Sequence, residues 1–334
     1  MKMKLNSFKM MRGMILSLVF GMTVFTSCSS DSDGGTNLTD AKYESTAAKY
    51  EIQGSSAPYS SIELTASGDY IIIKNSLAAS RPFALTDKIA SKFIARPVEE
   101  TRGYASPIIH GKYTKISDTE YKLEGFGTIT ISNSTSGAYS LEITETGKST
   151  YTLTAAKATQ NPSSDITKNL CRTWSFASYR IEMTVPNLGK VLDGEYTFND
   201  EGTDRLNRDL YNVFKSYGAI NMTYEQFLKS GGAVKIDASD MPESVIFTKT
   251  GTYMVLYANE TLAVATWTWS DESKGILRYS WDYSDMYSKN KSGNVEVSFR
   301  GNQLTFRETY KDESSTGNSN KVEGVFTYYM NEVK

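Results

Sequence analysis

The chain has 334 residues, 36 of them basic and 38 acidic, and its single histidine and 2 cysteines exclude most metal sites built from those residues. Residues 1–27 carry four basic and no acidic side chains, so a mature chain beginning at Cys28 has 32 basic and 38 acidic residues and a net charge of −6. This acidity argues against a nucleic-acid partner, because nonspecific binding to phosphates depends on Lys and Arg. We expect no metal, cofactor or catalytic site.

The first 27 residues are typical of a signal peptide. A basic segment, residues 1–12, precedes an apolar run from Gly13 to Phe25. This run is shorter than the roughly 20 helical residues that cross a bilayer. It ends in Phe25-Thr26-Ser27-Cys28, which resembles a bacterial lipobox with Phe25 in place of the usual aliphatic residue. We therefore expect diacylglyceryl-Cys28 to be the mature N-terminus and to anchor the protein in a membrane.

Residues 28–39 are predicted to be a flexible acidic tether. Ser29–Gly35 is rich in serine, glycine and aspartate. It resembles the export signal of surface lipoproteins of Bacteroidetes, while an ordinary solvated tether is the alternative. We expect an outer-membrane lipoprotein that faces the cell surface, with the periplasmic face as the second possibility. If Cys28 carries lipid, Cys171 has no disulfide partner.

The rest of the chain is predicted to be all-β. Alternation of apolar and polar residues between turn signals predicts two tandem antiparallel barrels or sandwiches, residues 40–158 and 165–334. The segment Ala158–Asp165, rich in Asn, Pro and Ser, is the predicted linker. The predicted strands are Ser61–Thr65, Tyr70–Lys74, Ile108–Lys115, Glu120–Glu124, Gly127–Ser132, Tyr139–Thr144, Thr150–Ala155, Trp174–Val185, Ser244–Thr248, Thr252–Asn259, Ala263–Ser270, Ile276–Tyr283, Asn294–Arg300, Gln303–Tyr310 and Val322–Met330.

The two halves resemble each other. Ser61–Ile71 matches Ser244–Met254, because both read as a strand, a tight glycine turn and a strand that starts at Tyr. Two further matches pair Gly111–Lys115 with Ala265–Trp269, and Tyr139–Ile143 with Val295–Phe299.

Each half also contains a predicted helical insertion. Thr86–Ala95 starts at the N-cap Thr86 and stops before Pro97. In the second half, Asp204–Tyr217 has an apolar face, and Thr223–Gln226 reads as a capping box that opens a short helix.

Four segments of the second half, Leu170–Phe176, Val245–Tyr253, Thr266–Trp269 and Asn302–Phe306, resemble the lipocalin-like (calycin-type) domains of Bacteroidetes lipoproteins. That family opens with Leu and Gly-x-Trp, whereas Arg172 replaces the Gly here. The first half lacks the opening Trp and begins with Lys49–Ile52. The resemblance implies an up-and-down barrel with an internal cavity, and it implies no particular activity.

An aromatic face is the candidate binding site of the second half. Alternation places Trp267 and Trp269 on one side of a strand, and Tyr279, Trp281 and Tyr283 on one side of the next. These side chains could line a cavity and stack on a hydrophobic or glycan ligand bound in it. The alternative is a filled core, which is usual in small barrels.

Three weaker signals have structural alternatives. The stretch Asn199–Asp204 could hold Ca²⁺, or it could be the acidic start of a helix. His110 looks like one position in a strand, and Gly125-Phe-Gly127 lies between two strands, which is the wrong context for a phosphate loop.

Three hypotheses about function follow. The first is a lipoprotein that binds a hydrophobic or glycan ligand in a barrel cavity, and the second is a structural or interaction lipoprotein whose filled barrels dock a protein partner. A hydrolase with two carboxylates is the third and weakest. A cavity of roughly 300 Å³ or more lined by Trp267, Trp269 or Trp281 would favour the first. The oligomeric state is not predicted.

Overall fold

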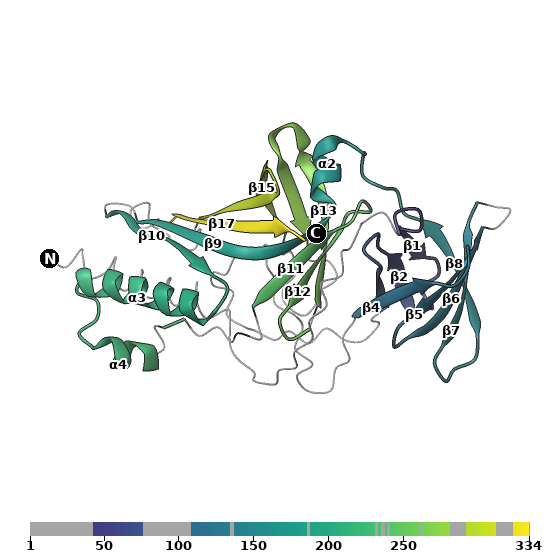
Figure 1. Cartoon of the computed structure of the whole chain (residues 1–334), viewed down its shortest axis with the longest axis horizontal. Helices are drawn as coiled ribbons and strands as arrows, with labels where there is room; N and C mark the ends of the chain where they lie inside the picture. Colours follow the sequence, from purple (N-terminus) through teal and green to yellow (C-terminus); the bar gives the residue numbers. More distant parts are fainter. Residues whose placement is uncertain are drawn as a thin grey trace.

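The computed structural model describes residues 43–75, 108–133, 137–185, 188–230, 233–234, 238, 241–260, 262–280, 292–311 and 323–333. Cys28, the signal peptide and the predicted helix Thr86–Ala95 lie outside these residues, as do Trp281 and Tyr283. The described residues form an all-β protein of two eight-stranded antiparallel barrels, as predicted (Figure 1).

The N-terminal barrel is an up-and-down barrel in which each strand pairs with the next and β1 pairs with β8 to close it. Apolar residues at alternate positions point inward and build one core, because successive side chains of a strand point to opposite faces. The strands are β1 (Ala48–Ile52), β2 (Tyr59–Leu64), β3 (Asp69–Lys74), β4 (Ile108–Lys115), β5 (Glu120–Leu123), β6 (Gly127–Asn133), β7 (Tyr139–Glu145) and β8 (Tyr151–Lys157).

The C-terminal barrel has the same plan. Its first strand, β9 (Thr173–Val185), pairs with β11 through its first residues and with β17 along most of its length, which closes the barrel. The other strands are β11 (Pro242–Phe247), β12 (Thr252–Tyr257), β13 (Leu262–Asp271), β14 (Ile276–Ser280), β15 (Ser292–Arg300), β16 (Gln303–Lys311) and β17 (Glu323–Glu332), with a 3-10 turn, η3 (Glu272–Lys274), before β14.

An arm extends from this second barrel, at the left of Figure 1. The second half of β9 pairs with β10 (Gly189–Thr197), and α3 (Asp200–Ser216) packs against β10. The helix α4 (Tyr224–Lys229) completes the arm, and its predicted capping box between Thr223 and Gln226 is present. The predicted helix Asp204–Tyr217 begins earlier than expected, because the Asn199 side chain accepts a hydrogen bond from the Gly202 N–H and caps the helix there.

Besides η3, three elements were not predicted. β1 alternates apolar and polar residues over only five positions, and Gly194 interrupts the apolar face of β10. The helix α2 (Asp165–Leu170) begins where the predicted linker ends, and it is capped by Ser164. Among the described helices, none is both long and apolar enough to span a membrane.

The strand registers make the two barrels equivalent residue by residue. Leu64 pairs with Tyr70 as Phe247 pairs with Tyr253, so β2–β3 corresponds to β11–β12 as predicted. Tyr113 on β4 then corresponds to Trp267 on β13. In the same way, Tyr50 lies opposite Ile62 as Trp174 lies opposite Val245. Tyr50 thus occupies the place of the opening Trp in the first half.

The predicted match between Tyr139–Ile143 and Val295–Phe299 is wrong by one strand. β7 is the seventh strand of its barrel, whereas β15 is the sixth, so β7 corresponds to β16. The error has a simple cause, because apolar alternation is shared by every half-buried strand and carries no strand identity. The prediction that the two halves fold independently stays a prediction.

Candidate functional site

The predicted aromatic residues that the structure describes lie on the inner side of the second barrel. Trp267 is 3% exposed and Tyr279 is fully buried, whereas Trp269 is only partly buried. The indole N–H of Trp269 donates to Thr167 Oγ1 of α2 at 2.8 Å, so this ring lies at the end of the barrel that α2 covers. The rings of Trp267 and Trp269 meet edge to face with centroids 5.7 Å apart. A binding role for these residues stays a prediction.

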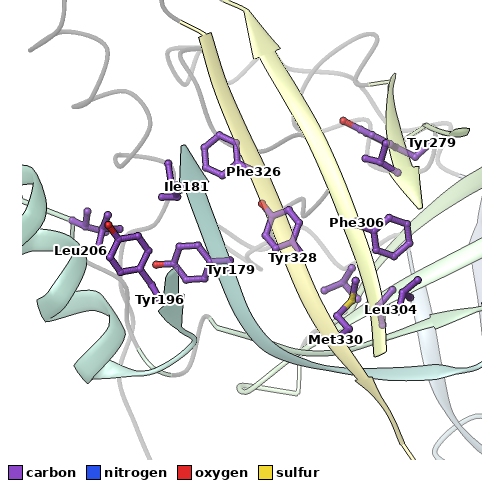
Figure 2. Packing of buried hydrophobic residues seen from close by; sticks show 14 of the residues in the cluster. Tyr179, Ile181, Tyr196, Leu206, Tyr279, Leu304, Phe306, Phe326, Tyr328 and Met330 are labelled. Carbon is purple, nitrogen blue, oxygen red and sulfur yellow. The ribbon is translucent and has the colours of Figure 1, made fainter. Parts of the chain in front are cut away.

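Large side chains fill the described part of the barrel interior. Figure 2 shows Phe326, Tyr328 and Met330 of β17 beside Leu304 and Phe306 of β16. These residues belong to one continuous core that also contains the rings of β12, β13 and β14. The predicted face is therefore packed against other side chains where the structure describes it.

One acidic side chain lies within this aromatic core. Glu308 is 7% exposed and accepts a hydrogen bond from the hydroxyl of Tyr279 at 2.6 Å. Gly293 provides space for that hydroxyl, because a Cβ there would come within 2.4 Å of it. Burial raises the pKa of Tyr279 far above its ordinary value, so the phenol stays a donor. The sequence signal for Glu308 was its position in the alternation after Leu304 and Phe306.

Equivalent turns join the second and third strands of each barrel. The N–H of Thr65 donates to Asp69 O at 2.8 Å, and the N–H of Thr248 donates to Thr252 O at 2.9 Å. Each turn contains a glycine with positive φ, Gly68 at 84° and Gly251 at 80°. An aromatic residue of the fourth strand fixes each turn in the same way. The hydroxyl of Tyr113 donates to the carbonyl of Thr65, and the indole N–H of Trp267 donates to the carbonyl of Thr248.

These turns form part of the contact between the barrels. Outward-facing Ile71, Ile73 and Ile108 of the first barrel form one buried cluster with Met254 and Val264 of the second. Ile71 and Met254 are equivalent positions in the repeat, so like surfaces face each other. Like surfaces that face each other are typical of the isologous interface of a two-fold dimer, and here they belong to one chain.

A cavity of about 100 Å³ lies between the barrels, and we call it the inter-barrel cavity. Its walls are equivalent segments of the two repeats, so the cavity lies across their approximate two-fold axis. The equivalent lining residues are Ala47 and Cys171, Ala48 and Arg172, Glu63 and Ile246, Leu64 and Phe247, Thr65 and Thr248, Ala66 and Lys249, and Ser67 and Thr250; Glu44, Gln160 and Thr173 complete the lining.

Charged side chains are among the residues that line this cavity. Glu63 is 3% exposed and accepts a hydrogen bond from the hydroxyl of Thr250. Lys249 forms an ion pair with Glu44, and Arg172 forms one with Glu332 of β17 at 2.6 Å. Sequence analysis missed this site, because most of its residues are polar or small and come from separate segments of the two halves.

Burial raises the pKa of the Cys171 thiol to about 12. The thiol is therefore protonated at neutral pH, and a protonated thiol is a poor nucleophile.

The weaker sequence candidates have structural roles or outward positions. Asn199 caps α3, and Asp204 bonds to Arg208 and Tyr224, which agrees with the helix-start interpretation. His110 is an exposed position on β4, and desolvation lowers its pKa against the opposing effect of Asp69. Within the described ranges, no three His, Cys, Asp or Glu side chains are placed to hold a metal ion.

Two barrels with the same strand order and pairing are compatible with a tandem lipocalin-like fold. No protein-family model, no curated protein and no solved structure matches this chain.

Proposed function

We propose that the protein is a lipid-anchored interaction module, with two lipocalin-like barrels that hold an outer surface in place for a protein partner. The observation that carries this proposal is the filled interior of the described part of the second barrel, in which Tyr253, Tyr279 and Phe306 are fully buried and Trp267 nearly so. A filled barrel offers its outer surface for binding. The binding of a hydrophobic or glycan ligand in the barrel is the alternative function.

The contact between the barrels supports a rigid module. A buried apolar cluster joins them, and the linker is fixed as well, since the N–H of Asn161 donates to Lys249 O at 2.7 Å. Free movement of the two barrels would expose Ile71, Ile73 and Ile108 of this cluster to water, which is unfavourable.

Anchoring at Cys28 would place the module near the outer membrane, on the cell surface in our proposal. The tether of residues 28–39 reaches at most about 40 Å when fully extended. Replacing Cys28 with Ser should move the protein from the membrane pellet to the soluble fraction. Unchanged pelleting would contradict lipid anchoring, and it would leave the partner question to the next experiment.

Site-specific photo-crosslinking in intact cells tests the interaction function. A crosslinking residue is placed at Tyr217 after α3 of the arm and, separately, at Ile116 after β4, the large apolar side chains with high exposure among the described residues, at 38% and 55%. We expect one reproducible protein partner from one of the two positions, and the other position serves as its matched control.

The alternative function is tested in parallel by native mass spectrometry of the purified lipoprotein. A lipid or glycan bound at one per chain, together with no crosslinked protein, would replace our proposal with the ligand-binding function.

A further inference from the structure

We propose that the inter-barrel cavity is a binding site for a compact zwitterion, of the size and chemistry of glycine or alanine. The cavity differs from the predicted aromatic face in position and in lining. The inference therefore does not depend on whether the barrels dock a partner protein.

The two walls of the cavity carry opposite charge where the repeats differ. The first barrel places Glu63 where the second has Ile246. The second barrel places Lys249 where the first has Ala66, and Arg172 where the first has Ala48. A molecule with an ammonium at one end and a carboxylate at the other complements such walls.

The carboxylate of Glu63 is the anchor for the ammonium. Among the described residues it has no ion-pair partner within 4 Å, and the hydrogen bond it accepts comes from the neutral Thr250 hydroxyl. Lys49 lies opposite Glu63 on β1, but its ammonium donates to Thr252 Oγ1 at 3.3 Å. A buried carboxylate is costly without a cation beside it, and a ligand ammonium would supply that cation.

Lys249 and Arg172 are suited to the ligand carboxylate. Their ion pairs with Glu44 and Glu332 hold them at the cavity wall. An ammonium has three donors and a guanidinium has five, so each side chain has donors beyond those used in its ion pair. A second acceptor can therefore join without breaking the existing contacts.

The size of the cavity sets the class of ligand. A volume of about 100 Å³ is somewhat smaller than a cavity of about 150 Å³ that holds benzene. It therefore suits a molecule of five or six non-hydrogen atoms. Among the apolar lining residues, Ile246 faces outward from its barrel and adds no polar side chain to the wall.

Isothermal titration calorimetry of the full lipoprotein in detergent tests the site. Glycine and alanine should bind saturably, whereas glycinamide, which lacks the carboxylate, and acetate, which lacks the ammonium, should bind at least about tenfold more weakly, because each loses a charge-assisted contact. Leucine should bind more weakly than glycine because its side chain exceeds the cavity.

Two variants assign the binding to this cavity. Glu63→Gln and Lys249→Met should each weaken glycine binding about tenfold or more, while Glu296→Gln, on the exposed surface of β15, should leave it unchanged. Circular dichroism checks that each variant is folded. If Glu63→Gln does not fold, glycine binding by Lys249→Met alone decides the result. No saturable binding, or binding that both variants retain, would overturn the proposal.

Discussion

Trp267 and Trp269 are two residues apart on β13, but they have different environments. Alternation correctly predicted that both point to the inner side of the barrel. It could not predict depth, because depth depends on what covers the barrel end, and α2 was not predicted. Trp267 is surrounded by core rings, whereas Trp269 lies under α2 and bonds to its Thr167.

We expect Trp267→Ala to lower the free energy of unfolding by about 3–5 kcal/mol, because it empties a large buried site. Trp269→Ala should cost less, about 1–3 kcal/mol, since part of its ring is already exposed and the loss includes one hydrogen bond to a buried hydroxyl. Urea midpoints of the two variants measure the difference. Equal losses would show that α2 covers Trp269 as completely as the core covers Trp267.

At the scale of elements, the turn between β11 and β12 is closely packed against the fourth strand. Gly251 has a positive φ, and a Cβ on it would lie 2.9 Å from the carbonyl oxygen of Trp267. Gly147, between β7 and β8, has a similar φ of 76° but no heavy atom within 4 Å of such a Cβ. The two glycines thus separate the cost of the backbone conformation from the cost of the close approach.

Gly147→Ala should lower the free energy of unfolding by about 1 kcal/mol, the cost of a left-handed conformation for a residue with a side chain. Gly251→Ala should cost about 1–3 kcal/mol more, because the turn must also move away from β13. Thermal melts of both variants test this, and a loss at Gly251 no greater than that at Gly147 would contradict the close approach.

The ends of β2, β7 and β8 are joined by hydrogen bonds to one carboxylate. The hydroxyls of Tyr59 and Tyr151 donate to Glu145 Oε1 at 2.8 and 2.6 Å. Burial, assisted by Glu145, raises the pKa of Tyr59 from 10.0 to about 12. A group whose pKa is higher in the folded state stabilises the fold below its unfolded pKa, and this contribution is lost as pH rises through the folded value.

We therefore expect the stability of the protein to fall between pH 10 and about 12, as Tyr59 ionises. Tyr59→Phe should make that part of the profile less steep, because one phenol is removed while Tyr50 and Tyr224, whose pKa burial also raises to about 12, still ionise there. Urea unfolding at a series of alkaline pH values, with phenolate absorbance recorded in parallel, makes the comparison. Tyr217→Phe, at an exposed position, is the matched control and should leave the profile unchanged.

At the scale of the whole molecule, strand content was predictable and the contact between barrels was not predicted. Tyr70-Ile71-Ile72-Ile73 and Tyr253-Met254-Val255-Leu256 are continuous apolar runs, which indicate strands buried on both faces. That signal could have located the interface. The polar members of the site could not be identified this way, since Glu63 in sequence looks like any solvent-facing strand residue.

We expect the two halves, residues 40–158 and 165–334, to unfold cooperatively when expressed apart, because each has its own closed barrel and core. Each should be less stable than in the full chain, since Ile71, Ile73 and Met254 then face water. Calorimetric melts of the halves and the full chain test this. If neither half shows a cooperative transition, the two barrels are one folding unit.

In a dimer of identical chains, every substitution is made twice, once on each side of the axis. A carboxylate placed on one wall would face a second carboxylate on the other, and the two would repel each other. Joining two copies in a single polypeptide removes that constraint, because each copy can then change alone. The turns at the contact between these barrels are alike in the two copies, whereas Glu63 and Lys249 each occur in one copy. A covalent repeat can therefore hold an unsymmetrical molecule on an axis where a symmetrical dimer could not distinguish its two ends.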